Sequence, residues 1–432
     1  MNRGISNSVE FGRGMMSAVL KNVLLLLAFA AAASKDLNSQ STVATQVQPV
    51  APSSTTRNAQ DFAGDDACRS CHREQVETYH HTAHFLTSRP ADGSTILGKF
   101  TPGNNILKTA NPALFFRMDE HKPDAKGKSS TGREPGFFQT AVEGTPPHTT
   151  SHTERFALVV GSGGKGQTYL FWKSDQLFQL PVSYWTNLGW VNSPGYRDGF
   201  VNFDRPIIPR CLECHATYFE ALPPPSNHYA TTGFALGIQC EKCHGPGREH
   251  IAREASQEKS KAVSASEAAI LNPARFSRDR QMDLCAWCHA GHGQALVPSF
   301  SYVPGDSLER FIDLPRPDPE AALDVHGSQV EMLKRSRCYS GSTMTCLTCH
   351  NVHTQQHDLA EFSRRCLDCH KPDSSTFSKP DHHVSANCID CHMPKQETGL
   401  IVFEWNGKRV RPQVRNHWIK VYSENDTPLE SR

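Results

Sequence analysis

One five-residue pattern recurs along this chain: two cysteines separated by two residues and followed at once by histidine. Its seven copies, numbered here as motifs 1 to 7 in chain order, begin at Cys68, Cys211, Cys240, Cys285, Cys346, Cys366 and Cys388. Together they use fourteen of the fifteen cysteines and leave only Cys338. A random chain of this cysteine and histidine content would contain roughly 0.03 copies. The repeat therefore reflects a specific chemistry.

The spacing Cys-x-x-Cys-His is the attachment signature of c-type haem. The two thiols add to the two vinyl groups of one haem, and the adjoining histidine binds the iron. Zinc sites complete a tetrahedron with a second cysteine pair or a distant histidine, and a disulfide framework does not require the histidine. The sequence therefore predicts seven covalently attached haem c groups.

The predicted haem-attaching thiols belong to Cys68, Cys71, Cys211, Cys214, Cys240, Cys243, Cys285, Cys288, Cys346, Cys349, Cys366, Cys369, Cys388 and Cys391. The predicted proximal iron ligands are His72, His215, His244, His289, His350, His370 and His392. For Cys338 we consider iron ligation, an intermolecular disulfide and simple burial, and favour burial.

The first residues of the chain resemble an export signal, as haem attachment outside the bacterial cytoplasm requires. Basic residues at Arg3, Arg13 and Lys21 precede an apolar run and the small residues Ala30 to Ala33. The run has about eleven residues, fewer than the roughly 20 that span a bilayer. We predict a signal peptide over residues 1–33, with an uncleaved anchor as the alternative. The mature chain would be periplasmic or otherwise exported, with no transmembrane span.

The spacing of the motifs suggests how the rest of the chain is organised. Residues 34–64 are rich in Ser, Thr, Gln, Ala and Pro and predict a disordered linker. A first haem-binding segment over 65–90 is followed by a β-containing insert over 91–209 and the main multihaem cytochrome domain over 210–432. Within the insert, residues 156–160 and 168–172 flank a glycine cluster and predict a hairpin, with a short strand over 176–180.

The predicted fold class is mainly α with long loops, a multihaem cytochrome c fold organised around covalently bound haems. In this prediction, β structure is confined to the small hairpin insert after the first haem. Helices are expected over residues 249–257, 262–271 and 357–369, where the composition is helical.

Several motifs and their flanking residues resemble multihaem cytochromes of the c-552/c-554 type, which are related to hydroxylamine-oxidising and nitrite-reducing multihaem proteins. The resemblance rests on Thr82-Ala-His84 after motif 1, on Gly-Pro-Gly-Arg-Glu-His250 after motif 3 and on Asn-Val-His353 after motif 5. It continues in Met-Pro-Lys395 after motif 7 and in Asn416-His417-Trp418.

In such proteins, a histidine shortly after one haem motif usually ligates a neighbouring haem. The resemblance therefore implies the distal ligands His84, His250, His353 and His417, with His382 or His383 as a fifth and His326 and His228 as further candidates. Haems with two histidine ligands tend to transfer electrons, whereas an open iron can bind and transform a small molecule.

We therefore predict an exported cytochrome that carries electrons through mostly bis-histidine haems. The alternative is a multihaem oxidoreductase with one open haem acting on a small nitrogen or sulfur compound. The nitrite-reducing relatives carry a motif ending in lysine, whereas all seven motifs here end in histidine. The expected partners are redox proteins such as a membrane quinol-oxidising complex or a terminal reductase. A net charge of +1 gives no polycation for nucleic acid.

Overall fold

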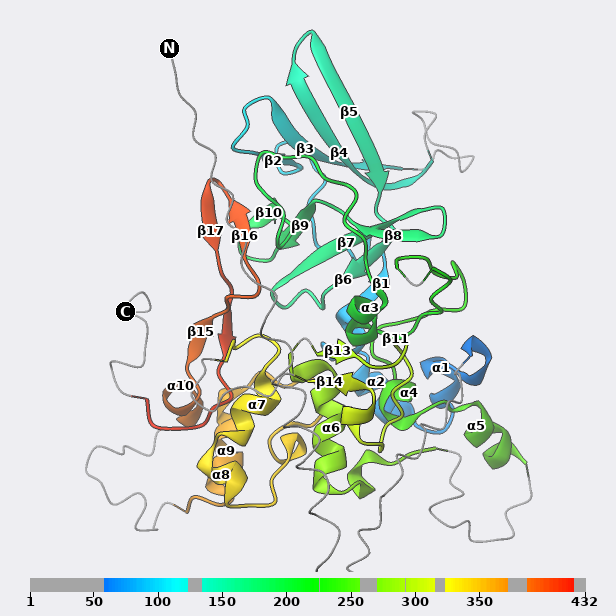
Figure 1. The fold of residues 1–432 in the computed structure, drawn as a ribbon, viewed down its shortest axis with the longest axis vertical. Helices are drawn as coiled ribbons and strands as arrows, with labels where there is room; N and C mark the ends of the chain where they lie inside the picture. Colours follow the sequence, from blue (N-terminus) through cyan, green and yellow to red (C-terminus); the bar gives the residue numbers. More distant parts are fainter. Residues whose placement is uncertain are drawn as a thin grey trace, which may run out of the picture. The chain divides into compact units, whose positions relative to one another are not determined.

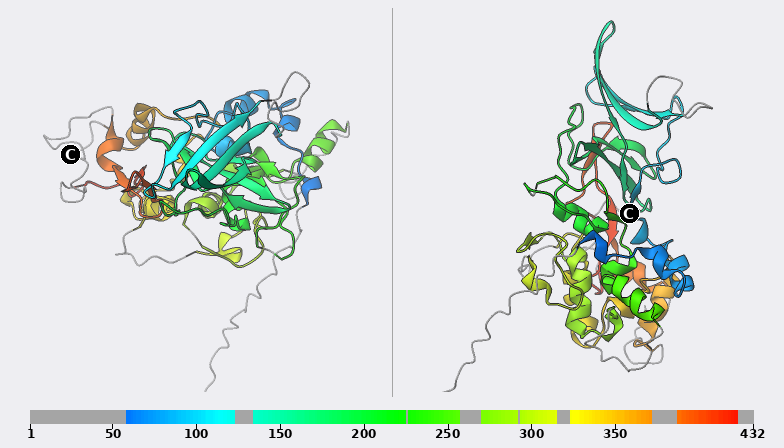
Figure 2. Two further views of the ribbon diagram at one scale, coloured as in Figure 1. Left: turned by 90° about the horizontal axis from the view of Figure 1, so that it is seen from above. Right: turned by 90° about the vertical axis from the view of Figure 1, so that its right-hand side faces the viewer.

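The computed structural model describes residues 58–122, 134–224, 226–256, 270–291, 293–314, 323–371 and 387–422, all within one compact unit. Of the residues described, helices and strands each make up about 26%. The prediction of a mainly α fold with one small hairpin is therefore wrong. Most helices gather on one side of a six-stranded antiparallel sheet, and a four-stranded sheet lies on the other side (Figures 1 and 2).

The six-stranded sheet has the order β1-β6-β7-β9-β10, with β8 also paired to β7. Its strands are β1 Ser88–Pro90, β6 Leu158–Val160, β7 Gly166–Lys173, β8 Gln176–Gln179, β9 Val182–Trp185 and β10 Gly189–Asn192. The pairing of β6 with β7 confirms the predicted hairpin, and β8 confirms the short strand after it. The turn requires glycine at Gly161, because φ is +111° and a Cβ would lie 2.6 Å from the carbonyl oxygen of Gly166.

The four-stranded sheet has the order β2-β3-β4-β5 and was not predicted. Its strands are β2 Ile106–Lys108, β3 Leu114–His121, β4 Gly136–Thr145 and β5 His148–Arg155. In β3, Leu114, Phe116 and Met118 are buried, and the residues between them are half-buried. This period of two places one face of the sheet against the core.

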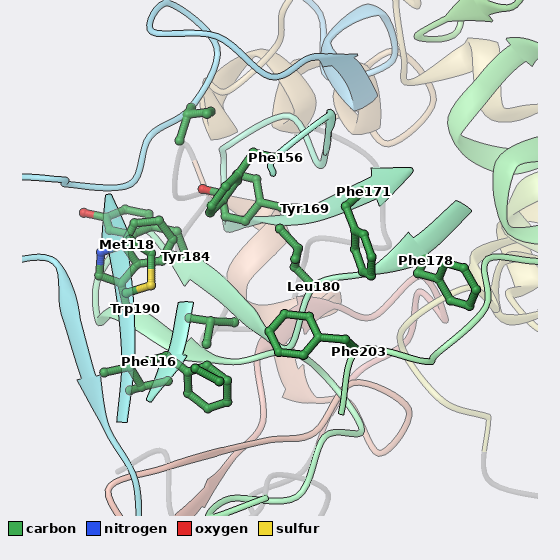
Figure 3. Packing of buried hydrophobic residues seen from close by; sticks show 14 of the residues in the cluster. Phe116, Met118, Phe156, Tyr169, Phe171, Phe178, Leu180, Tyr184, Trp190 and Phe203 are labelled. Carbon is green, nitrogen blue, oxygen red and sulfur yellow. The ribbon is translucent and has the colours of Figure 1, made fainter. Parts of the chain in front are cut away.

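One aromatic core joins the two sheets (Figure 3). Phe116 and Met118 come from the four-stranded sheet, and Tyr169, Phe171 and Trp190 from the six-stranded sheet. The ring of Trp190 makes edge contacts with Tyr184 at a centroid distance of 5.2 Å. Edge-to-face packing of this kind stabilises a core beyond the area it buries.

Strands near the C-terminus extend this β region. The pairs are β15 Lys395–Glu397 with β18 Gln413–Arg415, and β16 Phe403–Trp405 with β17 Lys408–Val410. The Asn192 side-chain amide donates to the carbonyl of Glu404 at 2.9 Å, and Phe403 packs on Trp185 at 5.0 Å. Residues from the predicted main cytochrome domain therefore contact strands of the predicted insert. Two further small pairs are β11 Ala216–Tyr218 with β12 Ala235–Leu236, and β13 Gln294–Ala295 with β14 Ile312–Asp313.

The helices are short and most of them carry or flank a motif. They are α1 Asp65–Cys68, α2 Arg73–Tyr79, α3 Pro209–His215, α4 Cys240–His244, α5 Arg248–Ala255, α6 Arg278–His289, α7 Gln329–Lys334, α8 Arg337–Ser340, α9 Leu359–Leu367 and α10 Cys388–His392. The 3-10 turns are η1 Ala59–Asp61, η2 Phe85–Thr87, η3 Pro273–Arg275, η4 Leu308–Arg310 and η5 Cys346–Thr348.

The predicted helices have different outcomes. Those over 249–257 and 357–369 correspond to α5 and α9. Most of the one over 262–271 lies outside the described residues. The signal peptide and residues 34–57 of the predicted linker lie outside them as well. The last residues of that linker are described, and Phe62 is buried beside Tyr218.

Candidate haem-binding site

Each motif lies at or beside a helical turn, and this local geometry presents both thiols on one side. Residues three apart are neighbours on a helix surface. The histidine amide closes the turn by donating to the carbonyl of the first cysteine, as in His72 to Cys68 at 2.9 Å and His350 to Cys346 at 3.0 Å. A single helical turn thus holds the cysteine pair and the histidine of each motif together.

All fifteen cysteines are free thiols, and none is buried. This is unusual, because free cysteine is among the most often buried residue types. Cys71, Cys211, Cys369 and Cys391 are exposed and the others are half-buried, including Cys338, for which we predicted burial. Accessible thiols in pairs are what covalent attachment of a cofactor requires.

Thiols from different motifs meet one another. A hydrogen bond from Cys240 lowers the pKa of Cys68, which joins motifs 1 and 3. In the same way Cys288 lowers the pKa of Cys214 to about 7, and Cys285 lowers the pKa of Cys346. These contacts join motif 4 to motifs 2 and 5.

Contacts also join motifs 5, 6 and 7. The amide of Cys388 in α10 donates to Ser363 Oγ in α9 at 3.0 Å, which joins motifs 6 and 7. Desolvation raises the pKa of Cys349, and the nearby thiols of Cys338 and Cys369 raise it further, so motif 6 lies close to motif 5. Each motif therefore has a neighbouring motif.

Three predicted distal histidines lie opposite three motif histidines. The ring centroids are 6.1 Å apart for His84 and His289, 6.1 Å for His244 and His353, and 6.3 Å for His350 and His417. A metal ion bonded to two imidazoles at about 2 Å on each side would hold their centroids about 6 Å apart. The pairs therefore fit a six-coordinate iron.

Hydrogen bonds orient several of these rings. Nδ1 of His244 lies 2.8 Å from the carbonyl oxygen of Leu271, and Nδ1 of His392 lies 2.9 Å from that of Lys420. Nδ1 of His417 lies 3.1 Å from the carbonyl of Arg415. A carbonyl only accepts, so Nδ1 carries the hydrogen and Nε2 keeps the lone pair that binds a metal.

Desolvation keeps His84 and His417 neutral. It lowers the pKa of His84 to about 4, assisted by the charges of His289 and His350. Burial lowers the pKa of His417 to about 4 as well. Because neutral imidazole is the form that ligates metal, the donor set suits iron at neutral pH.

The other predicted ligands have different surroundings. Desolvation lowers the pKa of His215 to about 4, and the charge of His326 contributes to this shift, so His326 lies close to motif 2. His250 lies on α5, where Arg248 donates to the carbonyl of Phe62 at 2.8 Å, just before motif 1. His382 and His383 lie outside the described residues.

The ring of His228 has protein partners at both nitrogens and lies among the strands. Its Nδ1 is 3.0 Å from Asp175 Oδ2, and its Nε2 is 3.0 Å from Gln176 Nε2. The structure does not bring it opposite a motif histidine.

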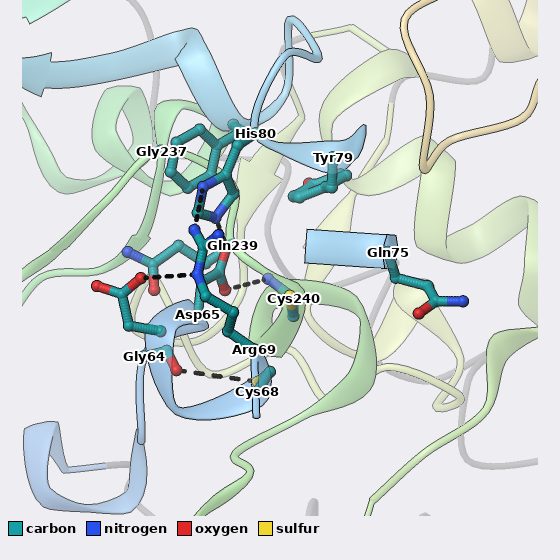
Figure 4. A network of polar contacts seen from close by, with 12 residues as sticks. Gly64, Asp65, Cys68, Arg69, Gln75, Tyr79, His80, Gly237, Gln239 and Cys240 are labelled. Carbon is teal, nitrogen blue, oxygen red and sulfur yellow. Dashed lines mark hydrogen bonds and ion pairs between the residues drawn. The ribbon is translucent and has the colours of Figure 1, made fainter. Parts of the chain in front are cut away.

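A polar network that the sequence analysis missed joins motifs 1 and 3 (Figure 4). Asp65 is 5% exposed, and its Oδ1 accepts from the amide of Cys240 at 2.9 Å. Its Oδ2 lies 3.4 Å from His80 Nε2, and the His80 ring stacks on Phe85 at 3.9 Å. The sequence feature that could have revealed this network is the acidic pair Asp65-Asp66 in the first turn of the motif helix.

A second carboxylate fixes the loop that carries His326. Asp324 accepts hydrogen bonds from the Thr398 hydroxyl at 2.6 Å and from the amides of His326 and Gly399. Desolvation alone would raise the pKa of Asp324, but these hydrogen bonds lower it below its usual value.

We expect Asp324→Asn to destabilise the protein by about 1–3 kcal/mol at pH 7. A depressed carboxyl pKa stabilises the fold above the unfolded pKa of about 3.9, and this contribution is lost as pH falls through the folded pKa. The difference in urea midpoint between wild type and variant should therefore shrink below about pH 4. A difference that stays constant from pH 7 to pH 3 would contradict this assignment.

Residues 201–245 match the family described as cytochrome c554 and c-prime. The matched segment contains motifs 2 and 3, where the structure shows paired accessible thiols followed by histidine. Over these residues the chain is similar to c-type cytochromes. Its paired motif thiols, each pair followed by histidine, are placed to attach haem c.

Comparison with solved structures finds a similarity to a protein titled "Crystal Structure of Outer Cell Wall Cytochrome OcwA". The two chains are 17% identical with a TM-score of 0.48, and the alignment covers 85% of this chain and 81% of that chain. No curated protein matches the chain. Across the residues described here, every helix is too short or too polar to cross a bilayer.

Proposed function

We propose that the chain is a c-type cytochrome that carries seven haem c groups, one at each motif, and passes single electrons between them. The observation that carries the proposal is the set of three histidine pairs, at 6.1 to 6.3 Å between ring centroids. Each pair joins a motif histidine to a histidine from elsewhere in the chain. Two axial imidazoles favour electron transfer over binding of a substrate at the iron.

The neighbouring thiols support an order for the motifs. Contacts join motif 1 to 3, motif 4 to 2 and 5, and motif 6 to 5 and 7. The haems supply reversible one-electron oxidation and reduction of iron, and the chain supplies their spacing, ligands and local charge. We infer that motifs 4 to 7 form a continuous series, with motif 2 as a branch from motif 4.

We further propose that the protein works outside the cytoplasm, after removal of residues 1–33. Haem c is attached there in bacteria, and the N-terminal residues have the pattern of an export signal. Its partners would be redox proteins, with a membrane quinol-oxidising complex or a terminal reductase as the expected class.

A haem count combined with electron paramagnetic resonance (EPR) tests the proposal. The pyridine haemochrome assay on the purified holoprotein should give seven haems per chain, one for each motif. The oxidised protein should show low-spin ferric signals without a high-spin component, and reductive titration accounts for coupled, EPR-silent pairs. Fewer haems would overturn the stoichiometry. A high-spin share near one in seven would favour the oxidoreductase with an open haem.

A further inference from the structure

A lysine is buried inside motif 3. Lys242 lies between Cys240 and Cys243 on α4 and is only 4% exposed. Its Nζ stands 3.9 Å from the centroid of the Trp287 ring and 4.8 Å from that of Phe300. An ammonium over aromatic rings is attracted by their π-electrons, and more strongly where water is excluded.

This lysine lies where three motifs meet. Trp287 is one of the two residues between the cysteines of motif 4 and is 2% exposed. The Lys242 ammonium also donates to the carbonyl of Thr217, two residues after the histidine of motif 2, at 3.4 Å. A single side chain rooted in motif 3 thus contacts elements of motifs 2 and 4.

We propose that Lys242 is a tuning residue that raises the reduction potentials of the haems at motifs 2, 3 and 4. This inference rests on the proposed function, because it requires haems at these motifs. A fixed positive charge stabilises the reduced iron, which carries one positive charge less than the oxidised iron. In a poorly hydrated interior this effect is weakly screened. Electrons entering the chain would therefore gather at the junction of these three motifs.

The test is a spectropotentiometric titration of the holoprotein with Lys242→Met and Lys242→Arg. Methionine keeps the length of the stem and fits between the aromatic rings, whereas arginine keeps the charge. In Lys242→Met, we expect the haems with the highest reduction potentials to titrate at lower potential than in the wild type. In Lys242→Arg, their reduction potentials should stay near the wild-type values. Lys173→Met, at an exposed position on β7, is the matched control and should leave the curve unchanged.

Haem counting separates the possible failures. Fewer than seven haems in the wild type would defeat the proposed function itself. A full haem complement with an unshifted curve in Lys242→Met would overturn only the tuning role. A third variant, Lys242→Gln, keeps a hydrogen-bond donor for Thr217. If both uncharged variants lose haem, Lys242 serves folding, and the tuning role is also overturned.

Discussion

Replacement of His84 by alanine should convert about one haem in seven from low spin to high spin, since one of the seven motifs would lose its second axial ligand. The His84 ring faces His289 at a centroid distance of 6.1 Å. The attachment residues of motif 4, Cys285, Cys288 and His289, stay intact in the variant. The haem should therefore remain attached while its sixth coordination position opens.

EPR and visible spectra of the oxidised protein measure this change. Added imidazole should restore the low-spin state by entering the space that alanine leaves. The matched control is His228→Ala, because the ring of His228 bonds Asp175 and Gln176 within the β region. It should leave the spin state unaltered. A His84→Ala protein that keeps all seven haems low-spin would exclude His84 as a ligand.

The sequence predicted the haem motifs because their chemistry is local. Two thiols and a histidine within five residues require only one helical turn, and a turn forms wherever the chain places it. Pairing across motifs depends on the tertiary fold. The geometry that sets His353 opposite His244, more than a hundred residues earlier, could be anticipated only by resemblance to related proteins.

The β region was underestimated although part of its signal was present. Leu114, Phe116 and Met118 alternate with residues that point away from the core, which is the period of a strand. The pair Asn406-Gly407 between β16 and β17 is a strong hairpin signal, and both residues have positive φ values. The prediction confined strands to residues 156–180 of the insert and took the C-terminal region as helices and loops, and so passed over both signals.

Strand β5 could not be predicted from hydrophobic pattern. Its sequence, His-Thr-Thr-Ser-His-Thr-Glu-Arg, has no large apolar residue, and most of its side chains are exposed. It is a strand because β4 pairs with it from Phe138 to Thr145. The secondary structure of such a segment is determined only by its tertiary contacts.

The largest effect on stability is expected from Trp190→Ala. Trp190 is 5% exposed, and its Nε1 donates to the carbonyl of Lys99 at 3.0 Å. The ring contacts Tyr184 at 5.2 Å and Tyr169 at 5.9 Å, which lie on neighbouring strands of the six-stranded sheet. Truncating a buried tryptophan leaves a cavity and costs about 3–5 kcal/mol in the free energy of unfolding.

Urea denaturation followed by far-ultraviolet circular dichroism measures the loss, with Phe200→Ala as control. Phe200 is 52% exposed, so its truncation should cost far less. The Soret band should be followed in the same titration. Because Asn192 and Phe403 join strands from both halves of the chain, we expect both signals to move to lower urea together. A Soret transition that stays at the wild-type midpoint would show that the motif region unfolds independently of the aromatic core.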